Sequence, residues 1–389
     1  MNYKTEYWKP YYKGSISKIN LLKFNSKLDR IRYYWNNKLV EKSKIKLYKN
    51  IELFYAIKAN PHKKIIKLLN DVGSSFDCAS LGEIELCLAS KVSVEKISYG
   101  STLKKEKDIE TAYKLGVNLY AFDSYEELSK IIKKAPGSKV FCRLMVPNGG
   151  AEWPLSNKFG CNYKEAERLI LIAKRNGLNP IGVSFHVGSQ QLLEETWKKA
   201  IEIASRVFKN LAQKNIILTF LNLGGGIPVN YQEKKRDHKS YASNIIKSIS
   251  KNFGNLMPTR IIMEPGRYLV ANAGIIESEV ILISDRSQNN QKRWVYIDVG
   301  RYNGLAETEG EAIHYEIKVK GYKKFKKESF VLAGPSCDSH DVIYNKKDCI
   351  LPSTLKCGDK LRIMEAGAYT VVYSSNFNGM KKISEFFIK

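Results

Sequence analysis

The 389-residue sequence has no C-x-x-C pair, no apolar run long enough to cross a membrane, and no apolar segment of the signal-peptide type near its start. A membrane-spanning helix needs about 20 consecutive apolar residues, and a secretory signal needs an apolar core behind a basic start. Residues 1–15 (MNYKTEYWKPYYKGS) are aromatic and polar instead. We therefore expect a soluble, cytoplasmic protein with no membrane partner.

Cysteine is present in an odd number, without the spacing of a metal site or of a disulfide framework. The seven cysteines are Cys78, Cys87, Cys142, Cys161, Cys337, Cys349 and Cys357. Structural zinc sites and disulfide-rich domains both use closely paired cysteines. We predict free thiols in a reducing compartment and no metal, and one of the thiols is a candidate for catalysis.

Basic residues exceed acidic ones, with 64 Lys and Arg against 39 Asp and Glu and a formal net charge of +25. Such a balance raises the question of a nucleic-acid partner. The lysines are scattered through nearly every segment, and the densest cluster is KKFKK at 323–327. We interpret the excess as compositional and predict no nucleic-acid binding.

From residue 50 to 267 the sequence repeats one pattern, in which a short apolar or β-branched run precedes a loop and an amphipathic stretch of helical period. The apolar runs are 51–57, 74–78, 96–100, 118–123, 139–146, 181–187, 218–223 and 260–264. Eight successive βα units predict a (β/α)₈ barrel. An open doubly wound sheet would place its glycine-rich phosphate loop after the first strand, whereas here that loop follows the seventh.

Beyond residue 267 the pattern changes to short β-type runs separated by Gly, Asn and Lys-rich turns. The runs are 268–284, 292–300, 312–321, 329–335, 360–367 and 368–375. We predict a C-terminal all-β domain over 268–389, a barrel over 28–267, and an N-terminal segment, 1–27, that could join the β-domain.

Active sites of (β/α)₈ barrels gather at the C-terminal ends of the strands. The first run ends at Lys58, where burial at the barrel mouth would favour the nucleophilic form of an amine. The sixth ends in FHVGSQ, which brings His186 to stack on a flat ring and Ser189 to bind phosphate. Alone, Lys58 is an ordinary surface lysine and His186 an ordinary core histidine.

The seventh and eighth runs lead into Gly224, Gly225 and Gly226 and into the motif EPGR. Glycines allow backbone N–H groups to approach a phosphate, and loops after strands seven and eight often form phosphate sites in such barrels. EPGR adds Glu264, which could pair with a protonated ring nitrogen, and then Gly266 and Arg267 near the phosphate. One cofactor would need all these groups together.

This set resembles the fold-type III pyridoxal-phosphate decarboxylases, the ornithine/diaminopimelate/arginine decarboxylase family. The resemblance covers residues 50–380 and rests on YAIKANP, FDCAS, FHVGS, LNLGGG, EPGR, GPSCDSHD and GAYT. It implies an alanine racemase-like architecture, a barrel with a β-domain, and pyridoxal 5'-phosphate as the cofactor.

By this resemblance Lys58 carries the cofactor as an imine, His186 stacks on its ring and Glu264 keeps the pyridine nitrogen protonated. The remaining cofactor contacts that it implies are Asp77, Arg143, Ser189, Gly224, Gly225, Gly226, Gly266, Arg267 and Tyr369. Cys337 would return the proton after decarboxylation, and Asp338 would contact the distal amine of the substrate. The resemblance also implies a homodimer in which Cys337 and Asp338 of one subunit complete the site of the other.

Glu264 favours decarboxylation, since the protonated pyridine is an electron sink and racemases of this family place an arginine there. The ending GAYTVVYSSNFNG resembles the ornithine group, which makes ornithine or lysine the expected substrate, putrescine or cadaverine the product, and polyamine synthesis the pathway. Glu307, Glu309 and Glu311 are candidates for a second acidic contact. The alternatives are diaminopimelate decarboxylase, whose second arginine is missing at the expected place, a racemase, and a non-catalytic regulatory relative.

Overall fold

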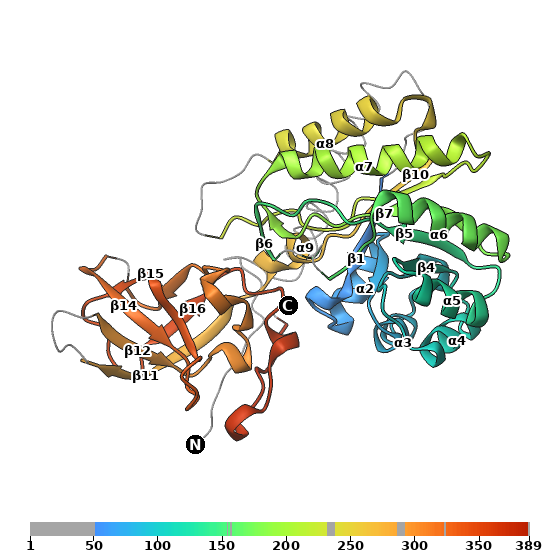
Figure 1. The fold of residues 1–389 in the computed structure, drawn as a ribbon. Helices are drawn as coiled ribbons and strands as arrows, with labels where there is room; N and C mark the ends of the chain where they lie inside the picture. The colour runs from blue at the N-terminus through green and yellow to red at the C-terminus, as the bar shows by residue number, and fades with distance from the viewer. Residues whose placement is uncertain are drawn as a thin grey trace. The chain divides into compact units, whose positions relative to one another are not determined.

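The computed structural model describes residues 51–153, 155, 158–231, 238–285, 292–322 and 324–387 (Figure 1). The chain divides into two compact units. Among the described residues, the first unit takes in 51–228 and 238–266, and the second takes in 229–231 and 267–387. Segment 1–27 lies outside the described residues, and its place beside the β-domain stays a prediction.

The first unit is built on a closed barrel of eight parallel strands. Its strands are β1 (Ile51–Ala56), β2 (Ser75–Cys78), β3 (Ile97–Tyr99), β4 (Leu119–Phe122), β5 (Lys139–Arg143), β7 (Asn179–Ser184), β9 (Phe220–Asn222) and β10 (Arg260–Met263). Each lies beside its neighbour in the chain, and β10 closes the barrel against β1. The predicted (β/α)₈ architecture is confirmed.

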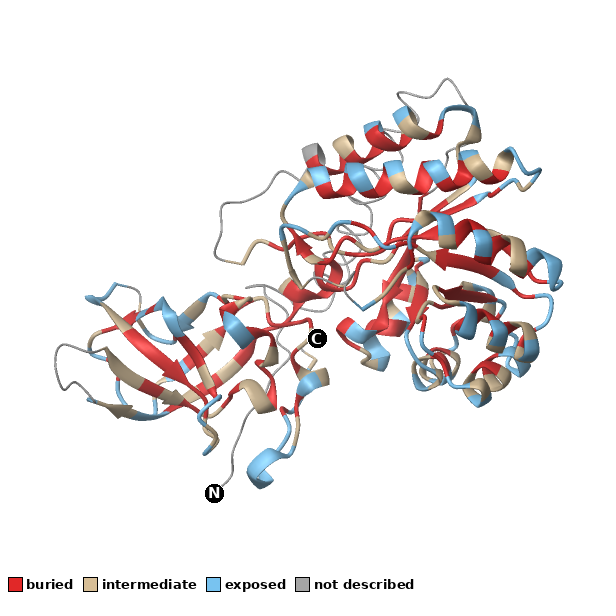
Figure 2. Ribbon diagram, in the orientation of Figure 1, coloured by how far each residue is buried: buried red, intermediate tan, exposed pale blue. Residues whose placement is uncertain are grey.

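Helices alternate with these strands, as the sequence period predicts. They are α2 (Lys63–Asp71), α3 (Leu81–Ala89), α4 (Glu106–Lys114), α5 (Tyr125–Lys134), α6 (Tyr163–Arg175), α7 (Glu194–Ala212) and α8 (His238–Phe253). Asn162 caps α6, because its side-chain oxygen accepts a hydrogen bond from the Glu165 N–H. Helix α7 buries one face, including Trp197, Ile201 and Phe208, and exposes the other (Figure 2).

The barrel is filled by side chains from strands that are far apart in the sequence. One buried cluster unites Phe54, Leu119, Ala121, Phe141, Phe220 and Ile262. Burial of such aromatic and aliphatic side chains contributes roughly 1.5–3 kcal/mol each. The interior is therefore a packed core, and the chemistry is confined to the strand ends.

Two short strands interrupt the βα alternation. β6 (Ala151–Trp153), after β5, pairs antiparallel with β8 (Ser189–Gln191), after β7. The sequence did not predict this two-stranded sheet, because each strand has only three residues. Among the described residues, no helix is both long enough and apolar enough to cross a membrane.

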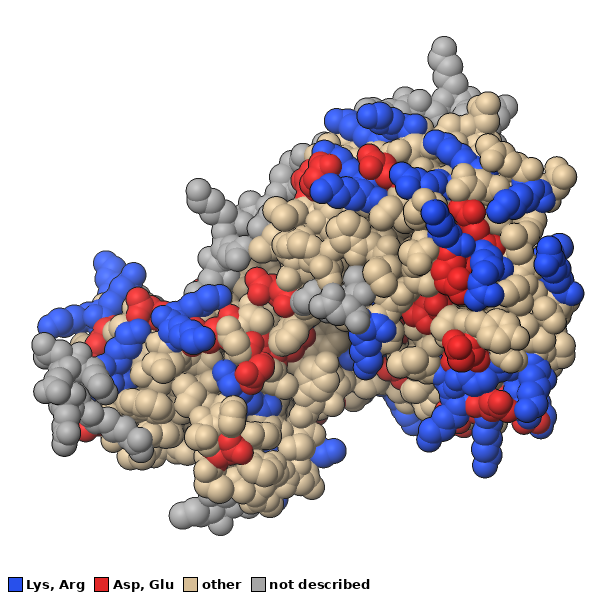
Figure 3. All heavy atoms as spheres, viewed as in Figure 1, with Lys and Arg blue, Asp and Glu red and all other residues tan. Residues whose placement is uncertain are grey.

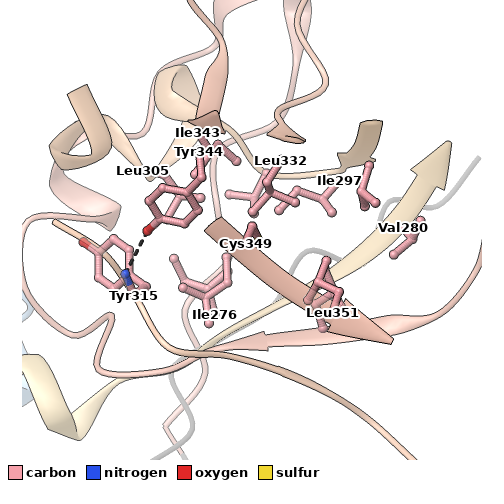
Figure 4. Close-up of a cluster of buried hydrophobic side chains, with 14 of the residues drawn as sticks. Ile276, Val280, Ile297, Leu305, Tyr315, Leu332, Ile343, Tyr344, Cys349 and Leu351 are labelled. Carbon is pink, nitrogen blue, oxygen red and sulfur yellow. Dashed lines mark hydrogen bonds between the residues drawn. The ribbon is translucent and has the colours of Figure 1, made fainter. Parts of the chain in front are cut away.

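The second unit contains a six-stranded sheet in the order β13-β16-β11-β12-β14-β15. Its strands are β11 (Ile276–Ser284), β12 (Arg293–Ile297), β13 (Ile317–Val319), β14 (Lys327–Ala333), β15 (Val342–Pro352) and β16 (Lys360–Ile363). Its core includes Ile276, Ile297, Leu332 and Tyr344 (Figure 4). The Tyr344 hydroxyl accepts a hydrogen bond from the Tyr315 N–H at 2.8 Å.

Three details of the predicted β-domain are wrong. Residues 267–273 form a short helix, α9 (Arg267–Val270), and a 3₁₀ turn (Ala271–Ala273) before β11 begins. Run 368–375 contains the 3₁₀ turn Val371–Tyr373, since Tyr369 has a left-handed φ of 55° that breaks an extended strand. Strand β15 was missed because polar residues 345–348 interrupt its apolar ends.

On the face of the molecule seen in Figure 3, basic and acidic side chains are interspersed. On the helices α4, α5 and α6 they form exposed ion pairs, such as Lys133 with Glu106 and Arg168 with Glu165. Such pairs contribute little to stability, about 0–1 kcal/mol each.

Candidate active site at the barrel strand ends

The strand register brings Asp77 and Lys58 to the same edge of the barrel. Asp77 pairs with Ala56, the last residue of β1, and Lys58 follows two residues later in the 3₁₀ turn Ile57–Ala59. Asp77 is buried, whereas Lys58 is exposed, contrary to the expected burial of its amine. Lys58 lies close enough to lower the pKa of Asp77, although burial outweighs it and raises that pKa overall.

On the opposite strands, Arg143 and His186 occupy the same edge. Arg143 ends β5 and pairs with Ser184, the last residue of β7, and His186 follows two residues later. Burial lowers the pKa of His186 well below its ordinary value, and the positive charges of Arg143 and Lys58 lower it further. His186 Nδ1 accepts a hydrogen bond from the Gly188 N–H at 3.0 Å. The imidazole is therefore neutral, which suits stacking on an aromatic ring.

Glu264 follows β10 directly and is fixed by Asn222, the last residue of β9. The Asn222 amide donates to Glu264 Oε1, and its oxygen accepts from the Gly224 N–H at 2.8 Å. Burial, with a smaller contribution from Asp77, raises the pKa of Glu264 to about 8. Asn222 was absent from the predicted site. Its signal was an amide in the apolar run LTFLNL, at a strand end that is 1% exposed.

The three glycines form a close-fitting turn beside these groups. A Cβ atom on Gly225 would lie 3.0 Å from His186 Nε2 and 2.6 Å from the Glu264 carbonyl oxygen. Gly224 has a left-handed φ of 65°, and a Cβ there would lie 2.2 Å from the Phe185 oxygen. Only glycine fits at these two positions, and the main-chain N–H groups of such a glycine turn are of the kind that can bind an anion.

Two further residues predicted to bind the cofactor also lie in the first unit. Ser189 is half-buried and begins β8, three residues beyond His186. Gly266 is buried against β1, where an added Cβ would lie 2.9 Å from the Ala59 Cβ. Several barrel strands end one to three residues before the ends of the apolar runs from which they were predicted. Parallel pairing stops there because the chain turns over the end of the barrel.

This edge fits a flat, phosphorylated, cationic heterocycle. One oxygen of the buried Asp77, Oδ1, has no hydrogen-bond partner among the described residues, and this oxygen packs closely against Gly100, where an added Cβ would lie 1.9 Å from it. Two carboxylates, a neutral imidazole, an amine and a glycine turn thus surround one region. An unpartnered buried carboxylate oxygen points to a missing donor or cation.

The other predicted residues lie in the second unit. Arg267 and Glu307 form a buried ion pair in which both terminal nitrogens contact the carboxylate. The same guanidinium bonds to the Tyr231 hydroxyl at 3.1 Å and stacks on the Tyr369 ring, 4.7 Å from its centroid. Glu307 is thereby occupied by Arg267.

The other two acidic candidates also have partners within the second unit. Glu311 accepts hydrogen bonds from three successive main-chain N–H groups, at residues 345–347. These bonds lower the pKa of Glu311 despite the opposing effect of burial. Glu309 is exposed and pairs with Arg301 at 2.9 Å. The three glutamates therefore have distinct structural partners.

Cys337 and Asp338 lie in the loop between β14 and β15. Cys337 is exposed, and Asp338 accepts hydrogen bonds from the main chain and ring of His340. These bonds and the Tyr302 hydroxyl lower the pKa of Asp338, so the side chain is an anion. Such a carboxylate can bind a cationic amine.

A parallel barrel with an amine, a carboxylate and a glycine turn at its strand ends defines a class of enzymes that bind a phosphorylated aldehyde cofactor. The family described as "Pyridoxal-dependent decarboxylase, pyridoxal binding domain" matches residues 37–271. This chain belongs to that family. A family of D-tagatose-1,6-bisphosphate aldolase subunits (GatZ/KbaZ-like) also matches residues 1–63, mostly before the described part.

The chain is similar in sequence to proteins of known name over most of its length. The lysine/ornithine decarboxylase of Selenomonas ruminantium is 34% identical over 84% of this chain and 81% of its own. Antizyme inhibitor 2 of Xenopus laevis is 33% identical over 87% of this chain and 76% of its own.

The fold is also similar to that of solved decarboxylase structures. The crystal structure of SrLDC in complex with pyridoxal phosphate and cadaverine has a TM-score of 0.81 and 29% identity, covering 97% of this chain and 94% of that one. The arginine decarboxylase of Paramecium bursaria Chlorella virus has a TM-score of 0.83 and 27% identity, covering 95% and 94%. The predicted family and cofactor are confirmed.

Proposed function

We propose that this chain is a pyridoxal-phosphate-dependent carboxy-lyase that converts a basic diamino acid, ornithine or lysine, to putrescine or cadaverine and CO₂, as in polyamine synthesis. The observation that carries the proposal is Glu264, a half-buried carboxyl fixed by Asn222 beside the glycine turn and His186. Relatives named for lysine and ornithine support the substrate class.

Residues of the barrel strand ends and of the second unit are proposed to bind the cofactor. Lys58 would hold the cofactor covalently, His186 would stack on its ring, and Glu264 would pair with the ring nitrogen and keep it protonated. By the family resemblance, the phosphate would be held by Ser189, the Gly224–Gly226 turn, Gly266, Arg267 and Tyr369, and Asp77 and Arg143 would be further contacts of the cofactor. When bound, pyridoxal phosphate supplies the electron sink that the departing CO₂ requires.

Asp338 binds the distal amine of the substrate, and Cys337 returns a proton to the substrate carbon. Asp338 is the ionised acid best suited to this role, because Glu307 and Glu311 are buried with partners of their own. We propose a homodimer in which the loop with Cys337 and Asp338 of one subunit completes the barrel site of the other.

Three measurements test the proposal. Borohydride reduction of the purified protein incubated with the cofactor, followed by peptide mass spectrometry, should place the cofactor on Lys58, and Lys58→Ala should lose it. Carboxyl-labelled ornithine or lysine should release labelled CO₂. Racemisation without CO₂, or release only from diaminopimelate or arginine, would overturn the substrate assignment.

Mixing of two inactive variants tests the shared site. Lys58→Ala and Cys337→Ala subunits, allowed to exchange, should recover about a quarter of the wild-type activity, since half of random dimers hold one intact site of two. No recovery from exchanged dimers would show that each subunit has its own complete site.

A second candidate is a regulatory protein without turnover, suggested by the similarity to antizyme inhibitor 2. The presence of Lys58, His186 and Glu264 at one barrel edge favours the enzyme. A protein that neither takes up the cofactor nor releases CO₂ from any basic amino acid would support the second candidate.

A further inference from the structure

One side chain that no assigned role covers makes two contacts with Cys337. Asn378 Oδ1 accepts a hydrogen bond from the Cys337 main-chain N–H at 3.2 Å, and the Cys337 Sγ lies 3.4 Å from the same oxygen. A carbonyl-type oxygen has two lone pairs, so it can accept both the N–H and the S–H. The contact therefore fixes the backbone of Cys337 and the direction of its thiol at once.

Asn378 is itself held in place. It lies in the 3₁₀ turn η8 (Phe377–Gly379) with a left-handed φ of 53°, which asparagine tolerates better than most residues. The neighbouring Phe377 ring stacks on Tyr302, with 4.4 Å between ring centroids. The Ser375 hydroxyl donates to the Tyr302 carbonyl oxygen at 2.7 Å. The turn is thus anchored to a second segment of the same unit.

The loop that carries Cys337 is anchored on its other side by Asp341, which is 3% exposed. Asp341 Oδ2 accepts a hydrogen bond from the Ser336 N–H at 3.0 Å, and Oδ1 accepts from the Arg301 N–H at 2.7 Å. The residue before Cys337 is therefore fixed by a buried carboxylate, and Cys337 itself by Asn378. Of these two residues, Asn378 is the one that contacts the Cys337 sulfur.

We propose that Asn378 is a positioning residue that holds the Cys337 thiol through its Oδ1 atom and directs it for proton donation. The proposal rests on the proposed function of Cys337. In that step the S–H bond breaks, a C–H bond forms on the substrate carbon, and the thiolate left behind is reprotonated from water. A neutral amide suits the task, because a carboxylate at position 378 would repel the thiolate that forms.

The test compares Asn378→Gly with Asn378→Asp in the full-length protein with its cofactor. Glycine accepts the left-handed φ without strain and removes the oxygen, whereas aspartate tolerates that φ and keeps an oxygen acceptor. The measurement is the rate of alkylation of Cys337 by iodoacetamide, followed by peptide mass spectrometry. Cys357, also exposed, is the internal reference.

Loss of the acceptor in Asn378→Gly frees the Cys337 sulfur from its hydrogen bond, so alkylation of Cys337 should speed up by roughly two- to five-fold, the equivalent of one weak hydrogen bond, with Cys357 unchanged. Asn378→Asp should be alkylated no faster than the wild type. An unchanged rate in Asn378→Gly, or an equal acceleration in both variants, would overturn the proposal.

A second measurement follows the products. With labelled ornithine or lysine, Asn378→Gly should divert part of the turnover from the diamine to the amino-aldehyde. If the proton went to the cofactor's carbon and not to the substrate's, the amino nitrogen would stay on the cofactor and water would supply the oxygen of the released aldehyde. Asn378→Asp should slow turnover with less diversion. Unchanged product ratios in Asn378→Gly would contradict the proposal, and a wild type without CO₂ release would refute the proposed function while the alkylation test still stands.

Discussion

Arg267 and Glu307 form a bidentate ion pair inside the second unit, with side chains only 4% and 8% exposed. The sequence makes Arg267 a candidate for phosphate binding and Glu307 one of three acidic candidates, with Glu309 and Glu311, for contact with the substrate. In the structure, both carboxylate oxygens of Glu307 already contact the guanidinium. A buried charge that loses its partner is costly.

The first prediction concerns this pair. Glu307→Gln should lower the free energy of unfolding by about 3 kcal/mol, because it leaves the buried Arg267 charge without a counter-ion. Urea unfolding of the cofactor-free protein measures the change. Glu309→Gln is the matched control: its carboxylate also contacts an arginine, Arg301, but is 63% exposed, so its loss should cost less than about 1 kcal/mol. Equal effects in both variants would contradict the expectation.

Much of the fold could be predicted because it depends on repeated patterns. Eight βα units specify the barrel, and its strand ends specify where chemistry gathers. The errors occur where local pattern and tertiary contact disagree. Strand β15 carries polar residues 345–348 in its middle, and Glu311 binds the main chain there. Sequence periodicity cannot predict a hydrogen bond between a strand and a carboxylate from a distant segment of the chain.

The site was predicted less completely than the fold for a related reason. Lys58, His186 and Glu264 stand out as single polar residues that end apolar runs, and one cofactor explains them together. Asn222 contacts Glu264, and Asn378 contacts Cys337. A hydrogen bond between residues 41 positions apart, such as that of Asn378 with Cys337, leaves no local trace.

The second prediction is a pH dependence set by Glu264. Its pKa rises from 4.5 to about 8 on folding, so between these values the folded chain binds more protons than the unfolded chain, and stability falls as pH rises. Glu264→Gln lacks this contribution. The stability of the variant relative to the wild type should therefore increase from about pH 5 to about pH 8, by at most about 1.4 kcal/mol per pH unit, and then level off.

Urea unfolding of the cofactor-free proteins across this pH range provides the measurement. Glu110→Gln serves as the control, because the exposed Glu110 has a pKa lowered by Lys114 and Lys134. Its contribution is present above its ordinary pKa and is lost as pH falls, so no rise is expected over the same range. A flat difference for Glu264→Gln would mean that the carboxyl is ionised in the folded, cofactor-free protein.

The third prediction tests the glycine turn by adding one methyl group. In Gly225→Ala the new Cβ would lie 2.6 Å from the Glu264 carbonyl oxygen and 3.0 Å from His186 Nε2, so the turn must shift against both residues. Cofactor affinity, measured by absorbance titration, should weaken at least about ten-fold, which is ~1.4 kcal/mol.

Gly82→Ala, in the first turn of α3, is the control for that prediction, because its nearest contact would be Ser80 Oγ at 3.9 Å. Alanine favours a helix more than glycine does, by up to about 1 kcal/mol, so this variant should keep both its stability and its cofactor affinity. If Gly225→Ala binds pyridoxal phosphate as tightly as Gly82→Ala, the close approach of the main chain at residue 225 has no part in cofactor binding, and the phosphate must be held by other residues of the proposed set.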